Sequence, residues 1–129
     1  TTFDNINNID IDIFDNVRIE SHQMKKYSMK EQVALVSKAA IYVTGCGGGA
    51  VMATFLPKGS SLLVFYLSNG GVENNQGTGK PARLDWDYFN NMAYTRVHWI
   101  PQRKKNTVQE VNVFVLLIQH ELEIIRRER

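Results

Sequence analysis

Residues 41–56 of this chain read IYVTGCGGGAVMATFL, and this stretch decides the fold. The apolar run 41–44 is typical of a buried strand, and an apolar helical stretch follows at 50–56. The glycine-rich segment 45–49 joins them. A strand that runs through a glycine loop into a helix leaves unpaired N–H groups at the start of the helix, which suit a phosphate or another anion. Because the spacing is not the full dinucleotide fingerprint and no Walker lysine follows, a purely structural turn is the alternative interpretation.

The elements around this stretch predict the topology. Ser28 and Glu31 form a capping box that opens a helix reaching the 41–44 strand. A second run, 61–67, is apolar on both faces, as a central parallel strand should be. With a short strand over 16–20, the order becomes strand, helix, strand, glycine loop, helix, strand. We therefore predict an α/β fold, a Rossmann-like three-layer sandwich with a mostly parallel sheet, which binds ligands at the carboxyl ends of its strands.

The remaining elements follow the long polar segment 68–82. Residues 83–92 predict a helix capped at Asp85 or slightly earlier. Residues 94–100 alternate as a further strand, which Pro101 should end. The lone histidines of the chain are interpreted as packed or surface side chains rather than ligands; they are His22, His98 and His120.

The last part of the chain predicts one long helix. Its apolar seam has spacings of three and four and should face the domain, and it consists of Val108, Val111, Val115, Ile118, Leu122 and Ile125. Three further apolar residues lie off this seam: Phe114, Leu117 and Ile124. We expect these three to contact a missing N-terminal lobe or a homodimer partner.

Length and composition limit the function classes. A chain of 129 residues with 43% hydrophobic and 22% charged residues is typical of one globular domain. We expect a poorly ordered or edge-strand segment over 1–15 and the Rossmann-like domain over 16–129. A net charge of +2 does not indicate a nucleic-acid partner, and the one cysteine excludes an internal disulfide. No apolar run is long enough for a membrane segment. The chain starts with Thr rather than Met, so we expect it to be a piece of a longer protein.

Residues 27–50, followed by Phe55-Leu56-Pro57-Lys58-Gly59-Ser60-Ser61, resemble one known family. This is glycosyltransferase family sixty-one, which includes xylan arabinosyl- and xylosyltransferases and an O-linked N-acetylglucosamine transferase. In its carboxy-terminal half, a helix that begins with a serine and an acidic-Gln pair leads to a strand, Gly-x-His-Gly-Ala-Gly-Leu, Phe-x-Pro-x-Gly and another strand. At the motif histidine this chain has Cys46 or Gly47, depending on the alignment of the glycines.

The resemblance implies the donor nucleotide-sugar-binding lobe of an inverting, metal-independent glycosyltransferase of the two-lobed GT-B type. The nucleotide sugar would be a substrate, with no cofactor and no metal. The acceptor site and the catalytic base would come from the missing lobe, so the catalytic residues are unknown and this lobe alone would be inactive. A eukaryotic source would imply the Golgi or ER lumen.

The expected nucleotide-sugar-binding residues combine the glycine segment with polar residues that flank the next strand end. They are Gly45, Cys46, Gly47, Gly48, Gly49, Ala50, Asn69, Asn74, Asn75 and Arg83. The alternative function is a non-enzymatic Rossmann-like interaction module with a structural glycine loop. Cysteine chemistry at Cys46 is a third interpretation, because a thiol at a helix N-terminus is often reactive.

Overall fold

The computed structural model of this chain describes residues 17–45, 48–67, 83–102 and 108–128. Within them the elements are η2 (Met24–Lys26), α2 (Met29–Val36), β1 (Ile41–Gly45), α3 (Gly48–Val51), η3 (Met52–Phe55), β2 (Ser61–Leu67), α5 (Arg83–Asn90), β3 (Arg96–Gln102) and α6 (Val108–Glu128). The described strands form one parallel sheet in the order β1-β2-β3. The prediction of an α/β fold with a parallel sheet is confirmed.

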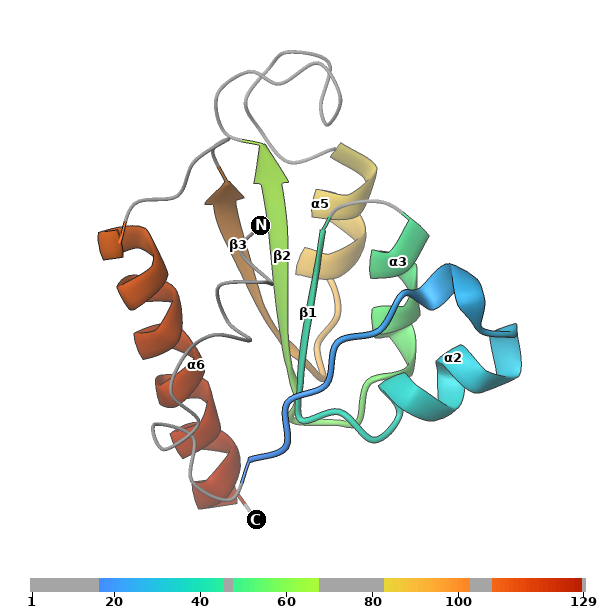
Figure 1. Cartoon of the computed structure of the whole chain (residues 1–129), viewed down its shortest axis with the longest axis horizontal. Coiled ribbons are helices and arrows are strands. Elements are labelled where there is room, and N and C mark those ends of the chain that lie inside the picture. The colour runs from blue at the N-terminus through green and yellow to red at the C-terminus, as the bar shows by residue number, and fades with distance from the viewer. Residues whose placement is uncertain (1–16, 46–47, 68–82, 103–107, 129) are drawn as a thin grey trace.

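Helices cover both faces of the sheet, so the fold has three layers (Figure 1). α6 lies on one face, whereas α2, α3, η3 and α5 lie on the other. Side chains alternate along the central strand β2: Leu62 and Val64 pack with the cluster under the short helices, and Leu63 and Phe65 pack towards α6. The predicted apolar run 61–67 has no polar face because both of its faces are covered.

The start of α2 agrees with the sequence. The Ser28 hydroxyl accepts a hydrogen bond from the Glu31 N–H, and the Glu31 carboxylate accepts one from the Ser28 N–H, both at 3.2 Å. The helix ends at Val36, earlier than predicted. The predicted helix 50–56 starts earlier, at Gly48, and consists of the single turn α3 followed by the 3-10 helix η3.

Two local predictions are wrong. Residues 17–20 form no strand, and Arg18, Ile19 and Glu20 are exposed, because this segment does not join the sheet. The third strand lies two residues later than predicted and runs through Pro101. Proline is tolerated there because β3 is at the edge of the described sheet, where one side of the backbone needs no donor. The helix predicted to be capped at Asp85 or slightly earlier begins at Arg83, so Asp85 lies inside α5 and the start is at the earlier position.

The predicted orientation of α6 is also partly wrong. Phe114 is 4% exposed and packs on Phe65, with ring centroids 5.2 Å apart, and Leu117 packs against the same cluster. Val108, assigned to the inward seam, is 78% exposed. The seam was misplaced because a glutamate was not expected inside, yet Glu121 is fully buried on the inner face. Phe114 and Leu117 are therefore not free for a partner.

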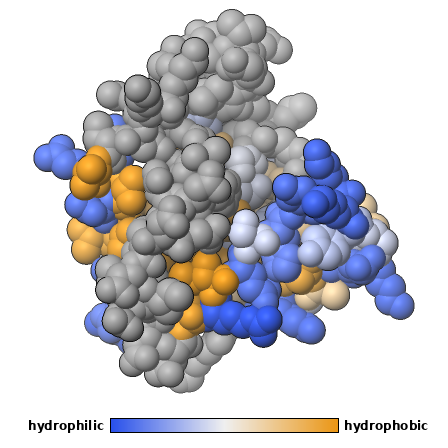
Figure 2. Space-filling view, viewed as in Figure 1, coloured by the Kyte–Doolittle hydropathy of each residue, from blue (hydrophilic) through white to orange (hydrophobic). Residues whose placement is uncertain are grey.

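The exposed apolar residues of α6 are instead Val108, Val113 and Leu116. Figure 2 shows apolar surface over the upper part of α6 and a largely hydrophilic surface over η2 and α2. In the part of the chain that the structure describes, α6 and the other helices lack the combination of length and apolarity that a membrane span needs.

Candidate functional site

The carboxyl ends of the three described strands meet at one edge of the sheet. The strands are parallel, and Gly45, the last residue of β1, is in register with Phe65 near the end of β2. α3 and α5 begin at this same edge (Figure 1). Crevices outside the carboxyl ends of parallel strands are the usual ligand sites of such folds. The edge that the sequence predicts as the ligand site is therefore present.

The predicted glycine segment is divided among several environments. Gly45 ends β1, Gly48, Gly49 and Ala50 lie in α3, and Cys46 and Gly47 lie outside the described residues. The Ala50 side chain is fully buried in the core, so only its main chain is available to a ligand. α3 has four residues. A helix this short has little macrodipole, and an anion here would depend on direct hydrogen bonds from individual N–H groups.

The end of β1 has open space on its glycine. A Cβ placed on Gly45 would meet none of the described atoms within 4 Å. The neighbouring Thr44 hydroxyl donates a hydrogen bond to the Gly45 carbonyl at 3.1 Å. This open space allows close approach of a ligand to the main chain.

The other predicted site residues follow the end of β2. Arg83 is the first residue of α5, and so its backbone lies at the same edge as Gly45. Asn69, Asn74 and Asn75 lie outside the described residues. The structure thus brings the backbone of Arg83 and the glycine segment to one edge of the sheet.

An aromatic pair near this edge was missed by the sequence analysis. The Trp86 ring, 44% exposed, packs on Trp99 with centroids 5.2 Å apart, and the Trp99 indole N–H donates to Asn90 Oδ1 at 2.9 Å. Trp99 is in register with Val64, which is in register with Thr44. Two strand spacings separate Trp99 from Thr44, a backbone distance of about 10 Å. The sequence offered one indication of this pair, because Trp86 lies in the first turns of a helix that starts at the ligand edge.

A buried charge cluster lies between β3 and α6. Glu121 has 1% of its side chain exposed; His98 Nε2 is hydrogen-bonded to its carboxylate, and Arg96 Nε lies 3.4 Å from its Oε2. This last contact is an ion pair without hydrogen-bond geometry, so both atoms lack a hydrogen-bond partner. Arg96 also donates to the Gly59 carbonyl at 2.7 Å. His98 is packed, as expected, and the cluster joins α6 to the edge strand.

A cavity of about 250 Å³ is lined by Lys58, Gly59, Ile125 and Glu128. Gly59 precedes β2, so this cavity is at the amino ends of the strands, away from the predicted ligand edge. It lies beside the Arg96 guanidinium, which pairs with Glu128 at 3.6 Å. Its acidic lining residue, Glu128, is thus already paired, and the cavity does not match the predicted site.

Comparison of the chain with protein-family models, curated proteins and solved structures finds no match. Within the described ranges, His, Cys, Asp and Glu side chains form no group of three or more arranged to hold a metal ion.

Proposed function

We propose that this chain is the donor nucleotide-sugar-binding lobe of an inverting, metal-independent glycosyltransferase. The observation that carries the proposal is the junction of β1, the glycine segment and α3 at the carboxyl edge of a parallel sheet. Open space at Gly45 supports it, because a diphosphate must approach the main chain closely. The resemblance of residues 27–50 and 55–61 to family sixty-one supplies the substrate class.

In this proposal the glycine segment binds the diphosphate. The N–H groups of Gly48, Gly49 and Ala50, with those of Cys46 and Gly47, donate to phosphate oxygens. Arg83 is proposed to pair with the same phosphates, because a guanidinium binds phosphate bidentately. Stabilising a leaving diphosphate is an electrostatic task that hydrogen-bond donors and a guanidinium perform. The acceptor and the catalytic base belong to another lobe.

The exposed face of Trp86 supports a nucleotide in particular. Aromatic side chains stack on bases, and every base offers such a face. Trp86 is on the same side of the sheet as α3, across β2 from the glycine segment. A ligand anchored by its phosphates at Gly45 would extend towards Trp86 over the end of β2.

A titration of the full chain with a nucleoside diphosphate, followed by chemical-shift mapping, tests the proposal. We expect shifts at residues 44–50 in the wild type and at least about tenfold weaker binding in Gly45→Val and Gly48→Val. Gly45→Val is the sharper variant, since a Cβ at this position meets no described atom within 4 Å and the substitution should leave the fold intact. Leu116→Ala, on the exposed surface of α6, is the matched control and should bind as the wild type does.

Two results would contradict the proposal. Shifts confined to residues 103–105 would indicate bulk attraction of the nucleotide to basic residues. Unchanged affinity of Gly45→Val for the nucleoside diphosphate would exclude the end of β1 from the binding site. Arg83→Ala gives a separate reading. The substitution should weaken the binding of the nucleoside diphosphate more than the binding of the nucleoside. If wild type and variant bind the diphosphate equally well, Arg83 is not part of the site.

A non-enzymatic interaction module is the second candidate. It is favoured by apolar side chains that reach the surface from α3, η3 and α5: Val51, Phe55, Trp86 and Tyr88 are each 44–52% exposed. If this function is correct, the nucleotide causes no shifts at residues 44–50. Phe55→Glu should then reduce the self-association or dye binding of the chain, measured by sedimentation and fluorescence.

A further inference from the structure

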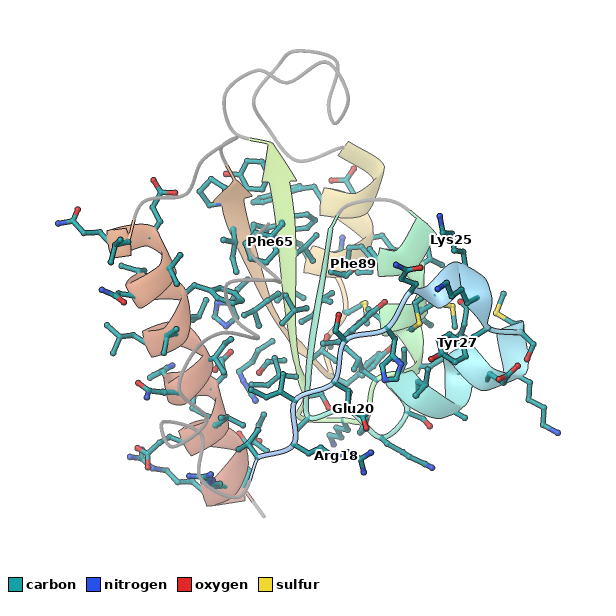
Figure 3. All side chains as sticks on the ribbon, in the orientation of Figure 1. Arg18, Glu20, Lys25, Tyr27, Phe65 and Phe89 are labelled. Atoms are coloured by element: carbon teal, nitrogen blue, oxygen red, sulfur yellow. The ribbon has the colours of Figure 1, made fainter. Side chains whose placement is uncertain are left out.

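A chain of hydrogen-bonded side chains lies on the segment that precedes α2. Arg18 Nη2 is 2.6 Å from Glu20 Oε1, His22 Nε2 is 3.1 Å from Glu20 Oε2, and His22 Nδ1 is 3.0 Å from the Tyr27 hydroxyl. Figure 3 shows Arg18, Glu20 and Tyr27 along this segment, away from the carboxyl edge of the sheet. The cluster is thus independent of the proposed nucleotide site.

The direction of these hydrogen bonds follows from the chemistry of the groups. The hydrogen bond from His22, and next the charge of Arg18, hold the pKa of Glu20 below its usual value, so the carboxylate is ionised at neutral pH. An ionised carboxylate only accepts, so the proton of the neutral imidazole is on Nε2. Nδ1 is then the acceptor, and the Tyr27 hydroxyl donates to it.

The cluster is fixed in place by α2. The Gln32 side-chain amide donates to the carbonyls of Met24 and Tyr27 at 2.9 and 3.0 Å, and Tyr27 directly precedes the cap residue Ser28. The Tyr27 and His22 rings meet edge to face, with centroids 5.6 Å apart. His22 keeps 29% of its side chain exposed, so a small reagent has access.

We propose that Tyr27 is a modification site whose phenol accepts an acyl group from an activated ester or amide. A hydroxyl, an imidazole that takes its proton and a carboxylate that orients the imidazole are the parts of an activated nucleophile. Tyr27 Oη bonds to the acyl carbon, and the bond from that carbon to the leaving group breaks. The phenol proton passes to His22 Nδ1 and then to the leaving group, and Glu20 stabilises the imidazolium formed between these steps.

The arrangement favours acyl over phosphoryl transfer. Attack on an acyl carbon benefits from a base that removes the proton of the nucleophile. Phosphoryl transfer passes through a loose transition state that depends mainly on positioning and on charge neutralisation of the phosphate oxygens. The group next to the Tyr27 hydroxyl is a base held by a carboxylate, which matches the acyl reaction.

The test is acetylation of the full chain by 4-nitrophenyl acetate, with peptide mass spectrometry to locate the acetyl group. Tyr88 and Tyr94 are internal references, because their hydroxyls are hydrogen-bonded to Thr54 instead of a base. We expect Tyr27 to react about tenfold faster than either reference, below the gain of an enclosed active site because the cluster is exposed. His22→Gln and Glu20→Gln should reduce the Tyr27 rate to that of Tyr94.

His120→Gln is the matched control, since His120 is also an exposed histidine beside a glutamate and should leave the Tyr27 rate unchanged. Circular dichroism of each variant checks that the fold is retained, as expected for substitutions at the surface. The proposal is overturned if His22→Gln leaves Tyr27 acetylation unchanged. It is also overturned if the acetyl group is found on His22 or Lys25 while Tyr27 reacts no faster than Tyr94.

Discussion

The face of the sheet under α6 and the face under α2, α3, η3 and α5 are covered in different ways. On the first face, one helix of 21 residues contributes Phe114 and Ile125 together with the buried carboxylate of Glu121. On the second, short helices enclose a cluster whose described buried members are apolar, among them Val36 and Phe89. One face therefore combines apolar packing with an ion pair, and the other depends on apolar packing.

This difference predicts different responses to substitution. Apolar side chains stabilise a fold through the area they remove from water. A buried ion pair adds little over apolar packing, yet removal of one partner leaves a buried charge uncompensated. At the ion pair on the α6 face, the loss of stability caused by a substitution should depend on whether the partner charge is still present. On the opposite face, the loss of stability should follow the side-chain volume removed.

The largest expected effect is the loss of a buried ring. Phe89→Ala and Phe114→Ala should each lower the free energy of unfolding by about 3–5 kcal/mol, with the greater loss at Phe89. Phe89 is 1% exposed and enclosed by side chains of several elements, whereas Phe114 projects from α6 and packs on one face of the sheet, against Leu63 and Phe65. Urea unfolding measures both, with Leu116→Ala as an exposed control. A greater loss at Phe114 would reverse this ranking of the two faces.

The next effect concerns the ion pair. Glu121→Gln should destabilise the chain by about 3 kcal/mol, because Arg96 and His98 lose their buried carboxylate. A double-mutant cycle with His98→Gln should give a coupling energy of about 1–2 kcal/mol. Additive effects of the two substitutions would show that the pair contributes no more than its separate groups.

Much of this architecture could be predicted because the apolar patterns are local. The run 61–67 and the capping box at Ser28 indicate their elements directly, and both are present. The inner face of α6 could not be predicted, since Glu121 reads as a surface residue until His98 and Arg96 of another element are placed beside it. The extension of β3 through Pro101 likewise depends on its position at the sheet edge.

For the candidate site, the sequence predicted the edge but not its full set of side chains. Thr44 and Gly45 end β1 as expected, because a glycine loop after an apolar run is a local signal. The contact of Trp86 with Trp99 joins a helix to a strand and has no local pattern. The hydrogen bonds that connect Glu20, His22 and Tyr27 depend on an irregular segment that the sequence analysis assigned in part to a strand.

A smaller loss of stability is expected from substitutions at the ends of the short helix α2, on the second face. α2 has eight residues and begins with a capping box, so each cap bond is a large fraction of its own stability. Ser28→Ala should lower the free energy of unfolding by about 1 kcal/mol. Ser37→Ala, at the other end of α2, removes a single hydroxyl bond to the Ala34 carbonyl at an exposed site. Equal losses for the two serines would show that the capping box adds no more stability than the single hydroxyl bond of Ser37.

The smallest expected effect is the pH dependence of stability that comes from a tyrosine on the second face, where burial disfavours a charged side chain. Burial raises the pKa of Tyr42, which packs against the apolar cluster of that face, and its side-chain hydrogen bond with Thr44 opposes part of this shift. Because the folded pKa is above the unfolded value, Tyr42 favours the folded state below the unfolded pKa. This contribution is lost as the pH rises through the folded pKa. Ultraviolet titration of wild type and Tyr42→Phe should show that the missing group ionises above the ordinary tyrosine range. If the missing group instead ionises at the ordinary value, water reaches Tyr42, and this part of the apolar face is less closed than its packing implies.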